Sequence, residues 1–125
     1  MNGFVLVALG GAIGASGRHL VGLATLRLMG PGFPWGTLAV NVIGAFLMGV
    51  LIELLALKFN ASADLRLFLA TGLLGGFTTF SAFSLDVALL MERKQYLLAG
   101  TYAGLSVFAS IAALFAGLAV IRALT

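Results

Sequence analysis

The stretch Thr71-Gly-Leu-Leu-Gly-Gly-Phe-Thr-Thr-Phe-Ser-Ala-Phe-Ser84 decides the fold, because it interrupts an apolar segment otherwise suited to crossing a membrane. Gly75 and Gly76 are followed closely by Thr78 and Thr79. Glycine costs about 1 kcal/mol relative to Ala in a helix, and hydroxyls compete for backbone hydrogen bonds. We therefore expect the helix to open at residues 75–78, near the bilayer midplane. Opened backbone at that depth is tolerated only in protein or against a polar cavity, and in transporters it marks the ion site.

The composition is that of an integral membrane protein. Of the 125 residues, 62% are hydrophobic and 9% are charged, and the mean hydropathy is +1.17. Soluble domains are about 45–50% apolar and about 25% charged. A spanning helix takes about 20 residues, so the chain has room for a single domain, residues 1–125, with four spans. The fold expected is all-α, with spans at about residues 3–26, 36–57, 65–91 and 96–121 and the third helix broken near its middle.

Several classes of protein are excluded by what the sequence lacks. The chain has no cysteine, so it has neither a disulfide framework nor a thiolate metal site. Its formal charge is only +3 and the basic residues are scattered, unlike the dense basic face of a nucleic-acid-binding protein. No group of residues suggests catalysis, so we expect no enzymatic activity. Membrane lipid is the expected surrounding.

The polar residues within the spans are nearly all neutral. In the last span Tyr102, Ser106 and Ser110 recur at i, i+4 and i+8 and form one stripe, and Asn41 stands alone in the second span. Cation pathways usually carry acidic rings or carbonyl cages, and proton relays use Asp, Glu or His. Hydroxyl and amide donors suit a small hydrated anion instead. For Asn41 the alternative is a hydrogen bond between helices, typically worth under about 1 kcal/mol in membranes.

Two further features of the broken span point to ions. Phe80 and Phe83 lie beside the break at i, i+3, and the positive edges of their rings are able to contact an anion; ordinary packing is the alternative. Carbonyls exposed at residues 75–78 would form an oxygen site for a hard cation such as Na⁺. If a two-fold axis crosses there, two copies would close the cage.

Arg18 is the charged residue inside a span that most needs an explanation. Such a residue usually faces the bundle interior or an aqueous cavity, so Arg18 is a candidate vestibule or structural charge. The alternative is that it reaches back to the nearer interface and anchors the helix. His19 is given no chemistry. Glu53, near the end of the second span, is expected to be solvated, and Asn60 or Ser62 to cap the third.

The loop charges predict no single orientation in the membrane. Four spans place both termini on one side. Each side then carries three basic residues: Lys58, Arg66 and Arg122 on one side, and Arg27, Arg93 and Lys94 on the other. Without a positive-inside bias, the chain is able to insert both ways. We therefore predict an antiparallel, dual-topology homodimer, in which a second copy is inverted.

Taken together, these residues resemble the fluoride channels known as Fluc or CrcB. The resemblance covers essentially the whole chain, and its strongest part is residues 71–84, supported by Gly36-Thr-Leu-Ala-Val-Asn41 and the stripe in the last span. It implies a passive, fluoride-selective channel that exports toxic cytoplasmic fluoride from the inner membrane of a prokaryote. The functional unit would be a dual-topology dimer with two pores.

The resemblance also implies roles for particular residues. Gly75 and Thr78 would give backbone carbonyls from both subunits to a central structural Na⁺. The pore would be lined by six side chains, namely those of Asn41, Phe80, Phe83, Tyr102, Ser106 and Ser110. Arg18 matches a basic position late in the family's first helix. Fluoride selectivity over chloride follows only from the resemblance, because donor stripes alone do not distinguish halides.

Two proton-coupled transporters are the rival interpretations. A small multidrug transporter needs an acidic residue embedded in the membrane, and the first span has none. A fluoride/proton antiporter needs a carboxylate on the path, and Asp86 is the only candidate, about eight residues past the break and nearer the headgroups than the midplane. A third alternative is a subunit that assembles with others and transports nothing.

Overall fold

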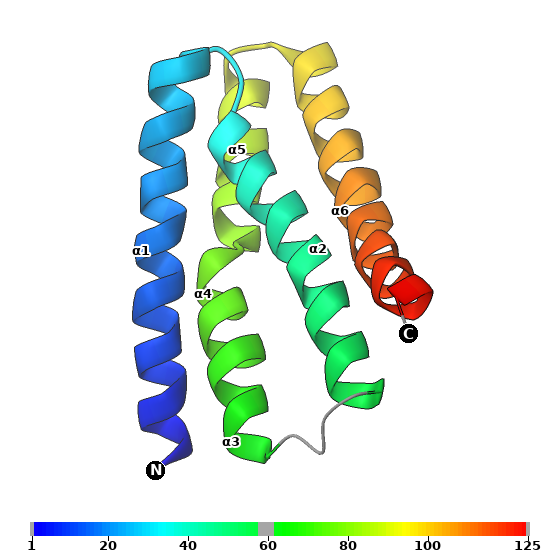
Figure 1. Ribbon diagram of the computed structural model, residues 1–125. Helices are drawn as coiled ribbons and strands as arrows, with labels where there is room; N and C mark the ends of the chain where they lie inside the picture. The colour runs from blue at the N-terminus through cyan, green and yellow to red at the C-terminus, as the bar shows by residue number, and fades with distance from the viewer. Residues whose placement is uncertain (1, 58–61, 125) are drawn as a thin grey trace.

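Four long apolar helices run up and down in chain order. The computed structural model describes residues 2–57 and 62–124, and within them four segments are long and apolar enough to cross a membrane. Figure 1 shows both termini at the same end, as an even number of crossings requires. The all-α fold and the four spans predicted from hydropathy are thus confirmed. Lys58 and Asn60, which entered the predictions above, lie outside the described residues.

The helix ends follow local capping chemistry. Helix α1 spans Gly3–Met29; the Asn2 side chain accepts a hydrogen bond from the Phe4 amide at its start, and Gly30 ends it with a positive φ of 78°. Helix α2 spans Trp35–Leu57 and begins directly after Pro34. The first connection is therefore residues 30–34, shorter than the segment 27–35 that the predicted spans leave, and Trp35 belongs to α2. The Ser62 cap is confirmed, because its hydroxyl accepts from the Leu65 amide.

The third span is a chain of helical pieces. It begins with α3 (Ala63–Arg66), continues as the π-helix η1 (Leu67–Leu74) and the short α4 (Gly75–Phe77), and resumes as α5 (Phe80–Glu92). Between α4 and α5 the backbone of Thr78 and Thr79 is extended. The predicted break therefore exists, but it lies at residues 78–79. Opening at Gly75 was wrong, because that residue keeps helical dihedrals of −62° and −39°.

Glycines bring α1 into backbone contact with the third span. A Cβ added to Gly10 would lie 2.8 Å from the Leu73 amide nitrogen, and one added to Gly14 would lie 2.8 Å from that of Phe77. A Cβ on Gly76 would lie 2.7 Å from the Gly11 carbonyl oxygen. These positions therefore require glycine for close approach, which is the packing role expected of small residues in lipid.

The last helix, α6 (Tyr96–Leu124), packs along α2. A Cβ added to Gly117 would lie 2.8 Å from the Val50 amide, so the two backbones nearly touch. Near the C-terminal end of α6, Arg122 donates from Nε to Glu53 of α2 at 2.8 Å. The expectation that Glu53 is solvated was wrong, since it is buried and ion-paired. Its partner is 69 residues away in sequence, so local reading did not reveal it.

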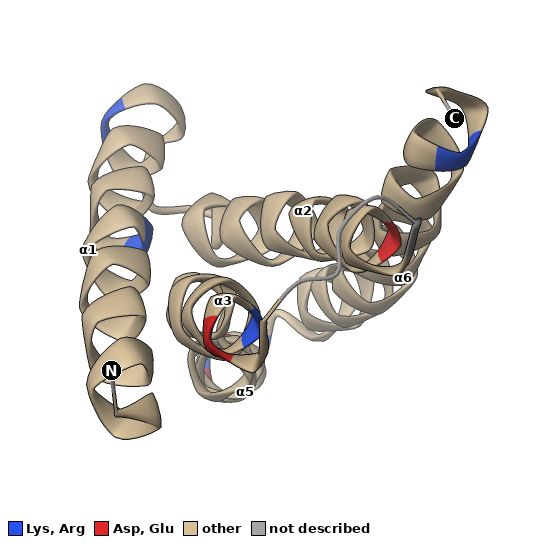
Figure 2. Cartoon of the chain, turned by 60° about the horizontal axis from the view of Figure 1, so that its bottom comes forward, with Lys and Arg blue, Asp and Glu red and all other residues tan. Residues whose placement is uncertain are grey.

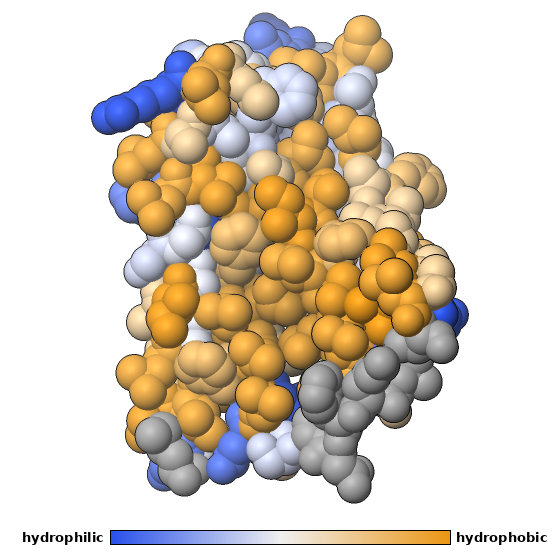
Figure 3. Space-filling model, viewed as in Figure 1, coloured by the Kyte–Doolittle hydropathy of each residue, from blue (hydrophilic) through white to orange (hydrophobic). Residues whose placement is uncertain are grey.

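Much of the apolar surface remains uncovered. Buried residues make up only 11–33% of the most apolar window of each span. The small core joins α2, α5 and α6 around Leu38, Leu90 and Tyr102. Figure 2 shows few charged residues along the ribbons, and Figure 3 shows a mostly hydrophobic face. The chain is therefore a multi-pass membrane protein whose outer faces suit lipid or other protein.

Candidate functional site: the break and its groove

The extended backbone at the break is held by one side chain of α2. Thr78 has φ −91° and ψ 160°, and Thr79 has φ −155° and ψ 125°. Asn41 accepts from the Thr79 amide at 2.8 Å and donates from Nδ2 to the Thr79 carbonyl at 3.0 Å. Thr79 in turn caps α5, because its hydroxyl accepts from the Ala82 amide at 3.1 Å. Asn41 therefore clamps both polar groups of Thr79, which leaves only one of its amide hydrogens for an ion.

The end of α4 exposes carbonyl oxygens. The last carbonyls of a helix have no partner within it. The Leu74 carbonyl accepts from both the amide and the hydroxyl of Thr78, at 3.1 and 3.0 Å. Gly76 accepts from Arg18 Nε at 3.1 Å. Within residues 2–57 and 62–124 no hydrogen bond to the carbonyls of Gly75, Phe77 or Thr78 is found.

These oxygens suit a hard cation. No group of three or more His, Cys, Asp or Glu that would hold a metal ion occurs in the described part of the chain. Backbone oxygen is a preferred ligand of such cations. The chemistry of the donor set therefore fits an alkali-metal ion better than a transition metal.

A groove with a volume of about 430 Å³ opens beside the break, and its mostly apolar lining holds a few polar side chains. It is lined on one side by Asn41, by Gly44 and by the α5 residues Phe80 and Phe83, and on the other by α6. The helices bring together five of the six predicted pore residues: Asn41, Phe80, Phe83, Ser106 and Ser110. Thr78 and Thr79 also line it, so the groove includes the opened backbone itself.

The hydroxyl stripe of α6 differs in its surroundings from one residue to the next. Ser106 is only 5% exposed, and its Oγ lies near the Tyr102 hydroxyl without forming a hydrogen bond of good geometry. Tyr102 lies outside the groove lining, fully buried, and its hydroxyl donates to Asp86 at 3.0 Å. A buried hydroxyl without a well-formed hydrogen bond costs stability, so the Ser106 hydroxyl is a donor available at the groove.

Aromatic rings run from the groove into the core. Phe80 and Phe83 have ring centroids 5.4 Å apart, and Phe83 lies 5.3 Å from Tyr102. Tyr102 meets Phe33 edge-on at 5.4 Å. At the other end of this row Phe80 is 76% exposed. The Phe80 ring, at the groove end of this row, is therefore available for contact with another protein surface.

A second cavity of about 530 Å³ lies on the far side of the break. Its charged lining residues include Arg18, Asp86 and Arg93, and Thr37 and Thr79 also line it. Thr79 lines both cavities. Thr79, held by Asn41, thus separates a cavity with charged lining residues from a groove whose polar side chains are uncharged. Arg18 lines this cavity and donates to the Gly76 carbonyl, a contact that favours a structural charge over an interfacial anchor.

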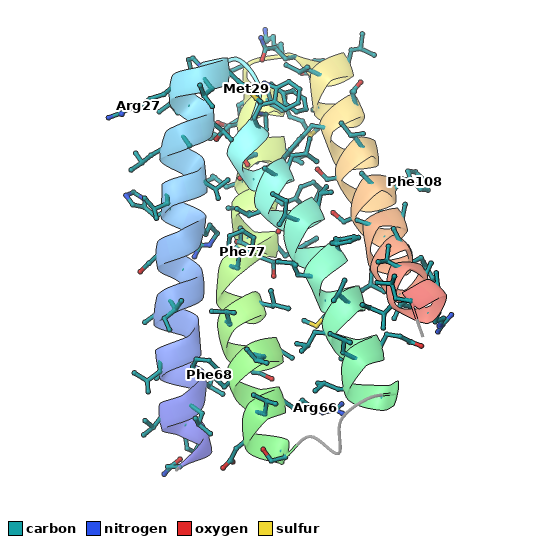
Figure 4. All side chains as sticks on the ribbon, in the orientation of Figure 1. Arg27, Met29, Arg66, Phe68, Phe77 and Phe108 are labelled. Atoms are coloured by element: carbon teal, nitrogen blue, oxygen red, sulfur yellow. The ribbon has the colours of Figure 1, made fainter. Side chains whose placement is uncertain are left out.

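Three residues at this site were not singled out for these roles by the sequence. Thr79 preceded a helical segment in the position of an N-cap, and Ser and Thr are preferred there, so the signal was present. Asp86 was judged too shallow, yet it meets Tyr102. The Phe77 ring lies between α1 and α2 (Figure 4). A Cβ added to Gly17 would lie 3.5 Å from this ring, and one added to Gly44 would lie 3.3 Å from it. No pattern of neighbouring residues in the sequence indicates that Phe77 packs between these two helices.

Comparison with known proteins identifies the family of the chain. Residues 5–118 match the family model described as "CrcB-like protein, Camphor Resistance (CrcB)". The chain belongs to the CrcB family. It is 62% identical over 120 residues to a protein of Rhizobium etli, covering 96% of each chain. It is 58% identical over 122 residues to one of Agrobacterium fabrum, covering 98% of each, and 60% identical over 119 residues to one of Hyphomonas neptunium, covering 94% of each.

All three relatives are named "Fluoride-specific ion channel FluC". The resemblance drawn from residues 71–84 is therefore confirmed at the level of the family. High identity over nearly the full length of each relative also means that the match is not confined to the break. It includes the α6 helix that carries the hydroxyl stripe up to residue 118.

Proposed function

We propose that this protein is a fluoride channel that conducts fluoride passively out of the cytoplasm across the inner membrane of a prokaryote. The names of its relatives support fluoride as the ion. The observation that carries the proposal in this chain is the buried Ser106 hydroxyl, which makes no well-formed hydrogen bond, in the groove beside the break. An anion that has lost water needs donors of this kind, and Ser110 continues the same stripe.

The electrostatics of the break favour an anion on one side. Helix α5 begins at Phe80, so its unsatisfied amides and the positive end of its dipole lie at the groove. Ring edges at Phe80 and Phe83 add further positive potential. The α4 end has the opposite character, with carbonyls of Gly75 and Thr78 that would hold a structural Na⁺. Bound there, the cation would satisfy those oxygens and offset their negative potential.

The functional unit that we propose is a dual-topology homodimer. Three basic residues on each side give no orientation bias, and the exposed Phe80 and the broad apolar faces leave surface for an inverted second copy. A C-terminal reporter should report both compartments. A reporter confined to one compartment would contradict this part of the proposal.

A proton-coupled transporter is the second candidate, because Asp86 lines the charged cavity and accepts from Tyr102. A carboxylate beside the path is what a fluoride/proton antiporter requires. If Asp86 carried the proton, Asp86→Asn would abolish transport driven by a pH gradient. In a channel the same variant leaves fluoride flux independent of any pH gradient.

Phe80→Ile tests the proposed path directly. Fluoride efflux from liposomes with equal pH on both sides should fall at least about tenfold, because one ring of the groove and its positive edge are lost. Phe108→Ile is the matched control, since Phe108 is 77% exposed and projects away from the bundle in Figure 4. Equal efflux from both variants would assign Phe80 to packing alone and remove the groove from the proposal.

A further inference from the structure

Within the described residues, Arg18 makes the only side-chain hydrogen bond from α1 to α4. Its Nε donates to the Gly76 carbonyl at 3.1 Å, and the side chain is partly buried. Just before it along α1, Gly14 and Gly17 lie against the third span. The guanidinium therefore enters the bundle where α1 is already in close contact with the break.

Gly76 is one of the carbonyls that the end of α4 leaves open. A basic side chain that donates to the last carbonyls of a helix is favourable both as a hydrogen bond and through the helix dipole. Because Arg18 takes Gly76, the oxygens without a protein partner among the described residues are those of Gly75, Phe77 and Thr78. The Arg18–Gly76 hydrogen bond thus determines which carbonyl oxygens at the break are free to bind a cation.

We propose that Arg18 is a positioning residue that ties down the Gly76 carbonyl and so determines which cation the break accepts. The statement about the cation rests on the proposed function, whereas the statement about the backbone does not. Selectivity among alkali-metal ions depends on the number and fixed arrangement of the oxygens around them. Released from Arg18, Gly76 would offer an additional, movable oxygen, and the cage would accept a larger ion.

Two substitutions separate the hydrogen bond from the charge. In Arg18→Gln the Nε2 amide nitrogen is bonded to Cδ, as Nε is in arginine, so a donor stays in place while the charge is lost. In Arg18→Met a methyl group occupies that position, so donor and charge are both lost. Arg27→Met is the control for losing an arginine from α1, because Arg27 is exposed and projects outward in Figure 4.

The first measurement is hydrogen–deuterium exchange of the purified full-length protein. The amides of residues 78–82 should exchange at least tenfold faster in Arg18→Met than in the wild type. They should be unchanged in Arg18→Gln and in Arg27→Met. Unchanged exchange in Arg18→Met, or fast exchange in Arg18→Gln, would overturn the proposal. If Arg18→Met is not recovered as folded protein, the Arg18→Gln result alone decides.

The second measurement is thermal stabilisation by NaCl or KCl at equal ionic strength. The wild type and Arg18→Gln should be stabilised by Na⁺ and not by K⁺, whereas Arg18→Met should respond to both. A loss of stability in Arg18→Met with unchanged discrimination between the ions would overturn the selectivity role. If neither ion stabilises the wild type, the proposed Na⁺ site is refuted, and faster exchange in Arg18→Met would still support the cap.

Discussion

The α2–α6 pair and the third span both pack through glycines, but they differ in how their backbone N–H and C=O groups are hydrogen-bonded. Along α2 and α6 the helices are continuous, Gly49 and Gly117 bring them into contact, and the Glu53–Arg122 pair joins their ends. The third span contains a π-helix and then an extended stretch whose polar groups are met by Asn41 or left open. One region is a frame, and the other is where ions find unfilled donors and acceptors.

The comparison teaches that glycine alone does not open a membrane helix. Gly75 and Gly76 remain helical, and Gly76 lies against the backbone of α1. The helix opens at Thr78 and Thr79, where side-chain oxygens and the Asn41 amide replace the missing backbone bonds. The position of the opening is therefore set by polar side chains, two within the span and one from α2, as the apolar surroundings require.

The largest expected effect comes from removing the clamp. Asn41→Leu leaves the Thr79 amide and carbonyl without partners, at a cost of about 1–3 kcal/mol each. We expect fluoride efflux from liposomes to fall about 100-fold or more, with the protein still folded because the α2–α6 contacts are untouched. Asn41→Asp, which keeps the acceptor for the Thr79 amide, should give an intermediate rate. Wild-type efflux from Asn41→Leu would show that the clamp does not shape the path.

Adding a methyl group to the frame should cost stability. In Gly117→Ala the new Cβ would meet the backbone of α2, including the Val50 amide at 2.8 Å, so the helices must separate. Overpacking typically costs about 1–3 kcal/mol. The unfolding temperature in detergent should fall in Gly117→Ala and should not fall in Gly100→Ala, where nothing lies within 4 Å of the added atom. Equal behaviour of the two variants would refute the close contact.

The ion pair of the frame offers a smaller effect. Glu53→Gln removes the charge that faces Arg122 but keeps the shape of the side chain. Since the arginine side chain is 62% exposed, solvent screens part of the attraction. We expect a modest fall in unfolding temperature that shrinks as salt is added, with fluoride efflux unchanged. A large loss of efflux would mean that the frame and the break are not separable.

The smallest effect is expected at the turn between α5 and α6. Lys94 has a positive φ of 61°, and the amides of Lys94 and Gln95 bond back to Met91 and Leu90. This is a helix C-terminus at which glycine is preferred. Lys94→Gly should raise stability by about 1 kcal/mol through relief of the left-handed conformation, whereas Lys94→Ala should not. A stability gain in the alanine variant would point to the lost charge instead.

Hydropathy predicted the four spans well because each is a long apolar run bounded by polar or proline-containing segments. The predicted second span, 36–57, differs from Trp35–Leu57 by one residue, and the first and last helices extend three residues further than predicted, to Met29 and Leu124. The π-helix over Leu67–Leu74 was not predicted, since its apolar residues fit either helical period. Spacing along one helix also identified the Ser106 and Ser110 stripe.

Contacts between residues far apart in the chain could not be predicted from the sequence. Asn41 was read as a donor to an ion or to another helix, and its position opposite Thr79 depends on how α2 crosses the third span. Glu53 appeared solvated because Arg122 is far along the chain. The inverted dimer and the central Na⁺ stay predictions, since both depend on a second copy of the chain.

The central claim is that the break and its groove form a passive path for fluoride. The most direct test is fluoride efflux from Na⁺-containing liposomes that hold the purified wild-type protein, with equal pH inside and outside and K⁺ with valinomycin to balance charge. We predict rapid fluoride release with no pH gradient, and chloride release at the rate of protein-free vesicles. Fluoride release no faster than that of protein-free vesicles, or release only when a proton gradient is imposed, would contradict the account.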